Sequence, residues 1–286
     1  MSDTGGSAVT EFLLGKGFFQ QLVLVLVVLA LLFFVFATVE YLFLSYQSIG
    51  SRSLELVPET VTAEDEQITI IQNPFEKRAK TIPVSDNERS GIEFTYSFYL
   101  YVNPSTFTGE DVLFSVFHKG YTTPFPLMGP AVFVKGNTNA LRVVMNTYRN
   151  PYTYIDIENI PVRKWFHCVV LCRKNALEVY INGNLRKKLS FEDTLPYQNF
   201  QNLILFSPLK FNLFKSQYVT LTEDMRVQGA FRGNLSNLFY LPYAASFTEI
   251  QSLMNLGVSS KTRKKTADTP PYLVDTYWTT SYQQQN

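Results

Sequence analysis

The chain contains very little cysteine and histidine, with two of each among 286 residues. On a strand, Cys168 and Cys172 would have Cα atoms roughly 13 Å apart, which is too far for a disulfide. Free thiols favour a reducing compartment that faces the cytosol. The one N-glycosylation pattern, Asn234-Leu235-Ser236, argues for the opposite side, so the orientation stays open.

The chemistry that needs histidine and cysteine is correspondingly absent. His118 and His167 have no partners at the spacing of a zinc site, and no Ser–His–acid order or glycine-rich phosphate loop is present. The net charge of +1 argues against a nucleic-acid-binding surface. We therefore expect no cofactor, no catalytic metal and no nucleic-acid partner. A structural calcium stays open, although the candidate carboxylates are scattered: Asp111, Asp156, Glu158 and Asp224.

Charge is missing altogether between Lys16 and Glu40. The uncharged run of about 23 residues is roughly 34 Å long as a helix, enough to cross a hydrocarbon core. A cleaved signal peptide has a shorter apolar centre of about 7–15 residues, so we predict a retained single-pass anchor in a lipid bilayer. The residues expected to face lipid include Leu22, Leu26, Leu29, Phe33 and Phe36.

The rest of the chain is rich in strand signals. Aromatic residues make up 15% of the sequence, and Phe94–Val102 alternates in the manner of a half-buried strand. Asn182-Gly183 between apolar segments predicts a tight hairpin, and Ser246 with Glu249 predicts a capped helix that ends at Gly257. The expected organisation is a flexible tail (1–15), a transmembrane helix (16–46), an extended stalk (47–90), a β domain (91–257) and an extended basic and aromatic tail (258–286).

Three segments of this domain carry a family resemblance. Phe94–Val102, Trp165–Leu189 (with WFH and LEVYING) and Phe231–Leu256 (with GNLSNLFYLPYAASFTEIQSL) resemble, in this order, the laminin-G/concanavalin-like family. The resemblance implies an all-β fold, a concanavalin-like antiparallel β-sandwich or jelly roll, here behind one N-terminal transmembrane helix. It implies no single function, because this fold hosts lectins, adhesion modules, glycosidases and structural proteins.

The glycosidases of this fold carry Glu-x-Asp-x-Glu on one strand. In this chain Tyr154 stands at the first position, where the nucleophile would be, and only Asp156 and Glu158 remain. We therefore expect that the protein is not an enzyme and that both acids face solvent.

Two segments are candidates for binding a partner. Tyrosine and arginine are enriched in interface hot spots, and the first segment, 146–154, supplies Tyr148, Arg149, Tyr152 and Tyr154. The second is the basic run of the C-terminal tail, which supplies Lys261, Arg263, Lys264 and Lys265. Alternate tyrosines that cap a sheet edge, and a solvated charge run, are the structural alternatives.

The combination of one membrane helix with a laminin-G-like domain resembles virion membrane or minor capsid proteins of large double-stranded DNA viruses. It implies a structural protein that links an internal virion membrane to a shell of capsid-type proteins, with the β domain facing the shell. The alternative is a carbohydrate-binding, lectin-like adhesion module whose partner is a glycan.

The anchor leads to a first testable prediction. Val28→Arg places a charge at the centre of the apolar run and is expected to oppose insertion by roughly 2.5–3.5 kcal/mol. Carbonate washing of membranes measures the outcome, since the wild-type chain should stay with the bilayer and the variant should be depleted. A wild-type protein that is released by carbonate, or that begins near residue 46, would contradict a retained anchor.

Overall fold

The computed structural model describes residues 17–85, 92–121, 127–191, 194–214 and 224–263, without the side chains of residues 43–52. The chain divides into two compact units, Met1–Arg52 and Ser53–Asn286. Among the described residues, the first unit contains one helix and the second contains all the strands.

The helix of the first unit, α2, runs from Phe18 to Arg52. Its segment Phe18–Leu42 has a mean hydropathy of 3.3 and none of it is buried within the protein. The five residues predicted to face lipid, Leu22, Leu26, Leu29, Phe33 and Phe36, are all exposed. The helix is therefore long and apolar enough to cross a membrane, a test of length and composition that a signal sequence also passes.

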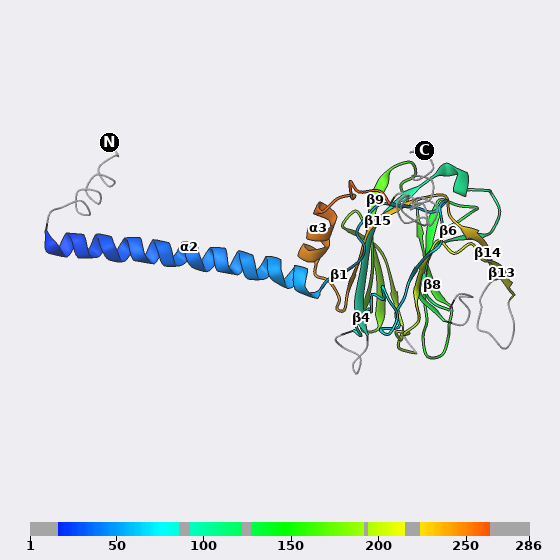
Figure 1. Cartoon of the computed structure of the whole chain (residues 1–286), viewed down its shortest axis with the longest axis horizontal. Helices are drawn as coiled ribbons and strands as arrows, with labels where there is room; N and C mark the ends of the chain where they lie inside the picture. Colours follow the sequence, from blue (N-terminus) through cyan, green and yellow to red (C-terminus); the bar gives the residue numbers. More distant parts are fainter. Residues whose placement is uncertain (1–16, 86–91, 122–126, 192–193, 215–223, 264–286) are drawn as a thin grey trace, which may run out of the picture. The chain divides into compact units, whose positions relative to one another are not determined.

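The second unit is a sandwich of two sheets that face each other (Figure 1). In the first sheet every pair of neighbouring strands is antiparallel. Its strand order is β1 (Leu54–Val57), β15 (Gly233–Leu241), β4 (Glu93–Val102), β9 (Trp165–Arg173), β10 (Ala176–Ile181) and β11 (Asn184–Ser190), and β2 (Val61–Thr62) also pairs with β15.

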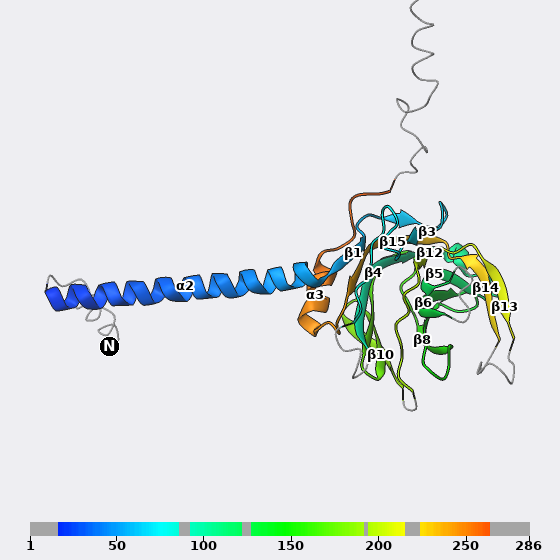
Figure 2. The ribbon, with the colours of Figure 1, turned by 60° about the horizontal axis from the view of Figure 1, so that its bottom comes forward.

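The second sheet has the order β13 (Lys210–Leu213), β14 (Met225–Ala230), β5 (Leu113–Gly120), β6 (Met128–Lys135), β7 (Ala140–Met145) and β8 (Thr153–Glu158). One edge of β5 is shared: it pairs with β14 in parallel and, further along, with β12 (Leu203–Leu205), which in turn pairs with β3 (Ile68–Ile70). Figure 2 shows β13 and β14 at one border of this sheet. All other strand pairs of this sheet are antiparallel, so the predicted antiparallel β-sandwich is confirmed, with β14 and β5 as the one parallel pair of named strands.

Strand β4 forms the centre of the core. Its alternate residues Phe94, Tyr96, Phe98, Leu100 and Val102 are at most 1% exposed, as the alternating pattern predicts. The rings of Tyr96 and Phe98 lie 5.8 and 5.2 Å from the ring of Phe117, which belongs to the opposite sheet. These contacts join the two layers.

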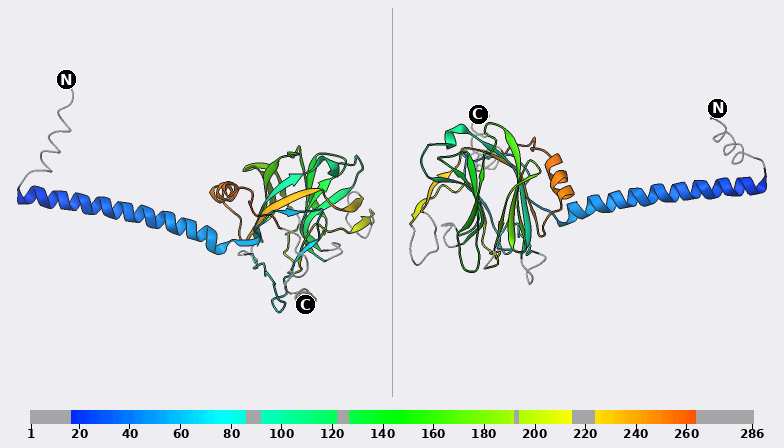
Figure 3. Two further views of the ribbon diagram at one scale, coloured as in Figure 1. Left: turned by 45° about the horizontal axis from the view of Figure 1, so that its top comes forward. Right: turned by 180° about the vertical axis from the view of Figure 1, so that it is seen from behind.

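A short helix, α3 (Phe247–Asn255), covers the outer face of the first sheet (Figure 3). The predicted capping box is present: Ser246 Oγ accepts a hydrogen bond from Glu249 N, and the Glu249 carboxylate accepts one from Ser246 N. Ile250 and Leu253 are buried in a separate apolar cluster with Val169, Leu171 and Leu241. A 3₁₀ turn, η1 (Pro104–Thr106), follows β4.

The prediction that residues 47–90 form an extended stalk is wrong for most of the described part of this segment. Residues 54–70 provide β1, β2 and β3, and Leu56, Val57, Val61, Ile70 and Ile82 are buried in the main core. The apolar residues of this segment occur in short runs between polar residues. The residues that pair with β1 and β2 lie between 172 and 186 positions further along the chain, as in Thr62 with Asn234 and Leu54 with Tyr240. Such long-range pairing leaves no local signal in the sequence.

The predicted C-terminal tail also begins as part of the sandwich. Thr60 N donates a hydrogen bond to Lys261 O, and Arg263 N donates one to Thr60 O. The Thr60 hydroxyl bonds to Ser236 Oγ and to Ser259 O. Residues 258–263 are therefore fixed against the segment that contains β1 and β2, while 264–286 lie outside the described residues.

The hairpin between β10 and β11 yields a prediction for stability. Asn182 and Gly183 have φ values of 49° and 75°, so both central residues are in the left-handed region, as a type I′ turn requires. We expect Gly183→Val to lower the free energy of unfolding by about 1–2 kcal/mol, because a β-branched residue resists positive φ. Chemical denaturation of the full chain in detergent measures this effect.

Arg186→Val is the matched control, because Arg186 is exposed and lies on the strand that follows the turn. Equal loss of stability in the two variants would show that the turn conformation is not the cause.

Candidate functional site

The loop between β7 and β8, predicted as a binding segment, is held firmly at its base. The Asn146 side chain is fully buried; its Oδ1 accepts a hydrogen bond from Met128 N (2.9 Å) and its Nδ2 donates to Pro151 O (2.8 Å). The Thr147 hydroxyl bonds to both N and O of Asn150. These contacts fix the loop from inside, so the residues at its tip are presented in a defined position.

Tyr148 is the most exposed ring of this loop, with 77% of its surface accessible. Its ring lies 5.2 Å from the ring of Tyr197, and the two backbones are joined by hydrogen bonds from Tyr148 N to Leu195 O and from Tyr197 N to Asn146 O. Leu195 and Phe200 on the same segment are 43% and 69% exposed. We call Tyr148, Leu195 and Tyr197 the aromatic rim.

The four predicted binding residues of this loop do not share one surface. Tyr148 and Arg149 are exposed at the tip. Tyr152 is only 4% exposed and packs in the apolar cluster on the outer face of the second sheet, so its predicted role in partner binding is wrong. Tyr154 is partly buried against the same cluster, and the Arg142 guanidinium lies 3.9 Å from the centre of its ring. A cation–π contact of this kind is internal rather than available to a partner.

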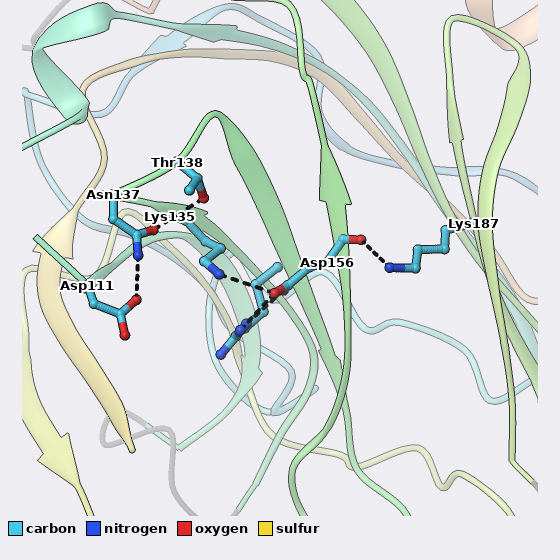
Figure 4. Close-up of polar contacts among 7 residues, drawn as sticks. Asp111, Lys135, Asn137, Thr138, Asp156 and Lys187 are labelled. Atoms are coloured by element: carbon cyan, nitrogen blue, oxygen red, sulfur yellow. Dashed lines mark hydrogen bonds and ion pairs between the residues drawn. The ribbon is translucent and has the colours of Figure 1, made fainter. Parts of the chain in front are cut away.

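An ion-pair network occupies the outer face of the second sheet (Figure 4). Arg142 Nε and Nη2 donate to the two carboxylate oxygens of Asp156 at 2.7 Å each, and Lys135 Nζ lies 3.3 Å from the same carboxylate. Lys187 Nζ donates to Asp156 O, which ties β11 of the first sheet to β8 of the second. Asp156 is thus a structural residue, and only Glu158 of the two predicted solvent-facing acids is exposed.

The electrostatics of Asp156 follow from this geometry. Burial raises the pKa of its carboxyl, but the hydrogen bonds and charges of Arg142 and Lys135 outweigh burial and hold the pKa below its usual value. Sequence reasoning missed Arg142. Its signal was one arginine inside the otherwise apolar strand ALRVVM, directly opposite Asp156 in the register of β7 and β8.

The histidines and cysteines are buried, and the two cysteines belong to the core between the sheets. Ser97 Oγ and His167 Nε2 are 2.7 Å apart, and burial lowers the pKa of His167 to about 4, so this imidazole is neutral near pH 7. Cys168 and Cys172 are free and buried, and burial raises the pKa of both thiols. Among the described residues, no group of three His, Cys, Asp or Glu side chains could hold a metal ion.

The second predicted binding segment is only partly described. Lys261 and Arg263 are exposed, and Arg263 Nε lies 3.7 Å from the Glu59 carboxylate. Lys264 and Lys265 lie outside the described residues. No contact brings this segment together with the aromatic rim in the part of the chain that is described.

Comparisons with known proteins agree with the sandwich. Residues 78–210 match the family described as the concanavalin A-like lectin/glucanases superfamily, of the laminin-G type. Residues 78–210, which include most of the sandwich strands, are therefore similar to laminin-G/concanavalin-like domains. No curated protein matches the chain.

Several solved structures are similar in shape. They include the binding domain of botulinum neurotoxin serotype D, with 10% identity, a TM-score of 0.45, and coverage of 71% of this chain and 42% of that structure. The ligand-binding domain of the same serotype in complex with N-acetylneuraminic acid has 10% identity and a TM-score of 0.45, and the match covers 72% of this chain and 42% of that structure. The binding domain of Paraclostridial Mosquitocidal Protein 1 has 14% identity and a TM-score of 0.44, and the match covers 69% of this chain and 42% of that structure. The match thus spans less than half the length of each of these structures.

The network at Asp156 yields a prediction for stability. Asp156→Asn keeps the shape of the side chain but leaves the Arg142 cation, whose side chain is 7% exposed, without its counter-charge. We expect a loss of about 3 kcal/mol in the free energy of unfolding near pH 7, at the lower end for a broken buried pair because Asp156 is partly exposed. Thermal or chemical denaturation measures the loss.

Two controls make this prediction sharp. Asp111→Asn removes an acid that bonds to Asn137 on the surface, and should change stability by no more than about 0.5 kcal/mol. Because the pKa of Asp156 is lowered in the folded protein, its stabilisation is complete above about pH 4 and is lost as the pH falls through the lowered value. A difference between wild type and Asp156→Asn that persists undiminished in strong acid would contradict an electrostatic cause.

Proposed function

We propose that this protein is a membrane-anchored interaction protein whose sandwich binds a neighbouring protein through the aromatic rim. The observation that carries the proposal is the exposed ring of Tyr148, which packs against Tyr197 and whose backbone N–H donates to Leu195 O. Tyrosine offers a large contact area, and it binds best when its position is fixed before the partner arrives. The hydrogen bonds between residues 146–148 and 195–197 supply that order in the free protein.

The neighbourhood of the ring supports the same role. Arg149 places a charged, exposed side chain directly after Tyr148, and Leu195 adds apolar surface. An apolar centre with polar groups around it is the usual anatomy of a protein interface. We propose no catalysis, because Tyr154 replaces the nucleophile of the related glycosidases and Asp156 is committed to the network with Arg142.

The anchor completes the proposal. We assign the apolar helix Phe18–Leu42 as a retained single-pass span, on the support of its length of 25 residues and its mean hydropathy of 3.3. We extend the setting to an internal virion membrane, where the sandwich would bind capsid-type shell proteins as a minor capsid protein. The support for this setting is the resemblance carried by an apolar helix and a laminin-G-like domain in one chain.

Glycan binding is the second candidate. The description of the matching family names lectins, and lectins of this fold would use the same sandwich without any catalytic residue. A glycan array probed with the full chain in detergent separates the two candidates, since binding to a defined glycan would place the lectin role first.

A crosslinking experiment tests the protein-binding role. A photo-crosslinking amino acid at position 149, in the membranes or particles that contain the protein, should join the chain to one defined protein neighbour. The same amino acid at Phe247 is the control, because Phe247 is 64% exposed but lies on α3. Lipid adducts alone, or equal yields from both positions, would contradict the proposal.

A substitution in the aromatic rim tests how much Tyr148 contributes to the binding affinity. Tyr148→Ala is expected to weaken binding of the crosslinked neighbour by about 2 kcal/mol, or roughly thirtyfold, because it removes an ordered hot-spot ring. Phe247→Ala should leave affinity unchanged. Both affinities are measured by titrating the purified neighbour against the full chain in detergent, and an unaltered affinity for Tyr148→Ala would exclude the rim as the binding surface.

A further inference from the structure

A pocket lies at the end of the sandwich where β5 ends and β12 begins. It has a volume of about 540 Å³, within the usual range for small-molecule sites. Residues 72–76 and 81–82 form one wall, residues 200–202 form another, and Lys119 of β5 completes it. The first wall belongs to the segment between β3 and β4. The side chain of Ile82 in this segment is buried in the main core.

Lys119 is the unusual member of this pocket. The residue is only 2% exposed, and its ammonium donates one hydrogen bond, 2.7 Å long, to Gln201 O. An ammonium has three donors, and among the described residues no carboxylate forms an ion pair with Lys119. A buried charge is costly unless it is paired. Burial accordingly lowers the pKa of Lys119 to about 8, so the amine is still mainly protonated at pH 7.

Hydrogen bonds within the protein hold the walls around Lys119 in place. Gln72 Nε2 donates to Ile70 O and Lys80 O, and its Oε1 accepts from Ile82 N at 2.8 Å. Gln72 N donates to Asn202 Oδ1, which joins the two walls. The pocket shape is therefore maintained by hydrogen bonds on both sides, and a ligand would not have to order it.

The lining indicates the chemistry of the ligand. One cation calls for one anionic group, and a carboxylate matches a single ammonium in charge and hydrogen bonding. The Thr81 hydroxyl and Asn202 Nδ2 provide polar groups suited to hydroxyls, while the exposed ring of Phe200 offers a flat apolar surface. A ring that carries hydroxyls, one apolar face and one carboxylate fits all three features.

We propose that this pocket binds an acidic sugar, through an ion pair between the sugar carboxylate and the buried ammonium of Lys119. The proposal goes beyond the protein-binding role of the aromatic rim and holds whether or not that role is correct. Glu76 is the acid in the pocket lining and opposes the ligand charge. His118, the chain neighbour of Lys119, is bound to Tyr121 O, and burial lowers its pKa.

The test uses the full chain in detergent micelles and a matched pair of ligands. Glucuronate and glucose differ in the carboxylate, so calorimetric titration should show glucuronate binding at least tenfold more tightly. Acetate should show no saturable binding, because it lacks the ring. Equal binding of glucuronate and glucose would overturn the ion pair, and displacement of glucuronate by equimolar acetate would overturn the sugar.

Variants locate the site. Lys119→Met should remove the preference for glucuronate, Glu76→Gln should strengthen glucuronate binding at least twofold, and Lys210→Met, at an exposed lysine of β13, should leave it unchanged. If Lys119→Met does not fold, the pH dependence of the wild type carries the test. Affinity should fall as the pH rises through about 8, where Lys119 loses its charge. A flat profile from pH 7 to 10, or wild-type affinity in Lys119→Met, would overturn the assignment.

Discussion

The contact between the inward rings of β4 and Phe117 is the constraint on which the rest of the sandwich depends. Tyr96 and Phe98 reach across from the first sheet to this one ring of β5, and all three are fully buried. Aromatic rings in such contacts bury a large area and add directional packing. Once β4 and β5 are fixed face to face, β9 and β15 add to β4 on its two sides, and β6 adds to β5. The remaining strands extend these two pairs outward.

The outer face of each sheet also carries apolar side chains, and a different set of contacts covers them on each sheet. On the first sheet, α3 buries an apolar cluster under Ile250 and Leu253. On the second sheet, an apolar cluster around Phe133 and Val144 lies beside the charged network of Arg142 and Asp156. A buried ion pair is weak evidence for stability, because desolvation offsets much of the attraction. Its clearer consequence is register, since Arg142 reaches Asp156 only when β7 and β8 are paired as observed.

The elements that the sequence predicts correctly are encoded by local patterns. The elements that it does not predict depend on pairing between distant parts of the chain. The alternation of Phe94–Val102, the turn at Asn182-Gly183 and the cap at Ser246 are each encoded within about ten residues, and all three are confirmed. Strands β1 and β2 are short and pair with β15, so the segment that contains them looked like a stalk. Tyr152 and Tyr148 are similar in sequence context, and only the fold separates the buried ring from the exposed one. Lys119 gave no signal, because a lysine near the end of a strand is ordinarily exposed.

The segment 195–202 contributes to both surfaces, yet it holds them by separate contacts. Tyr197 N is fixed by Asn146 O on the side of the aromatic rim. Two residues later, the Asn199 side chain donates to Lys119 O and Gly129 O, and this buried amide anchors the segment to β5 and β6 between the rim and the pocket. Because side-chain amides in such positions resist displacement, loss of the Tyr148 ring leaves the Gln201 carbonyl in place on Lys119. The two surfaces are therefore independent in their support, and Phe200 belongs to the pocket alone.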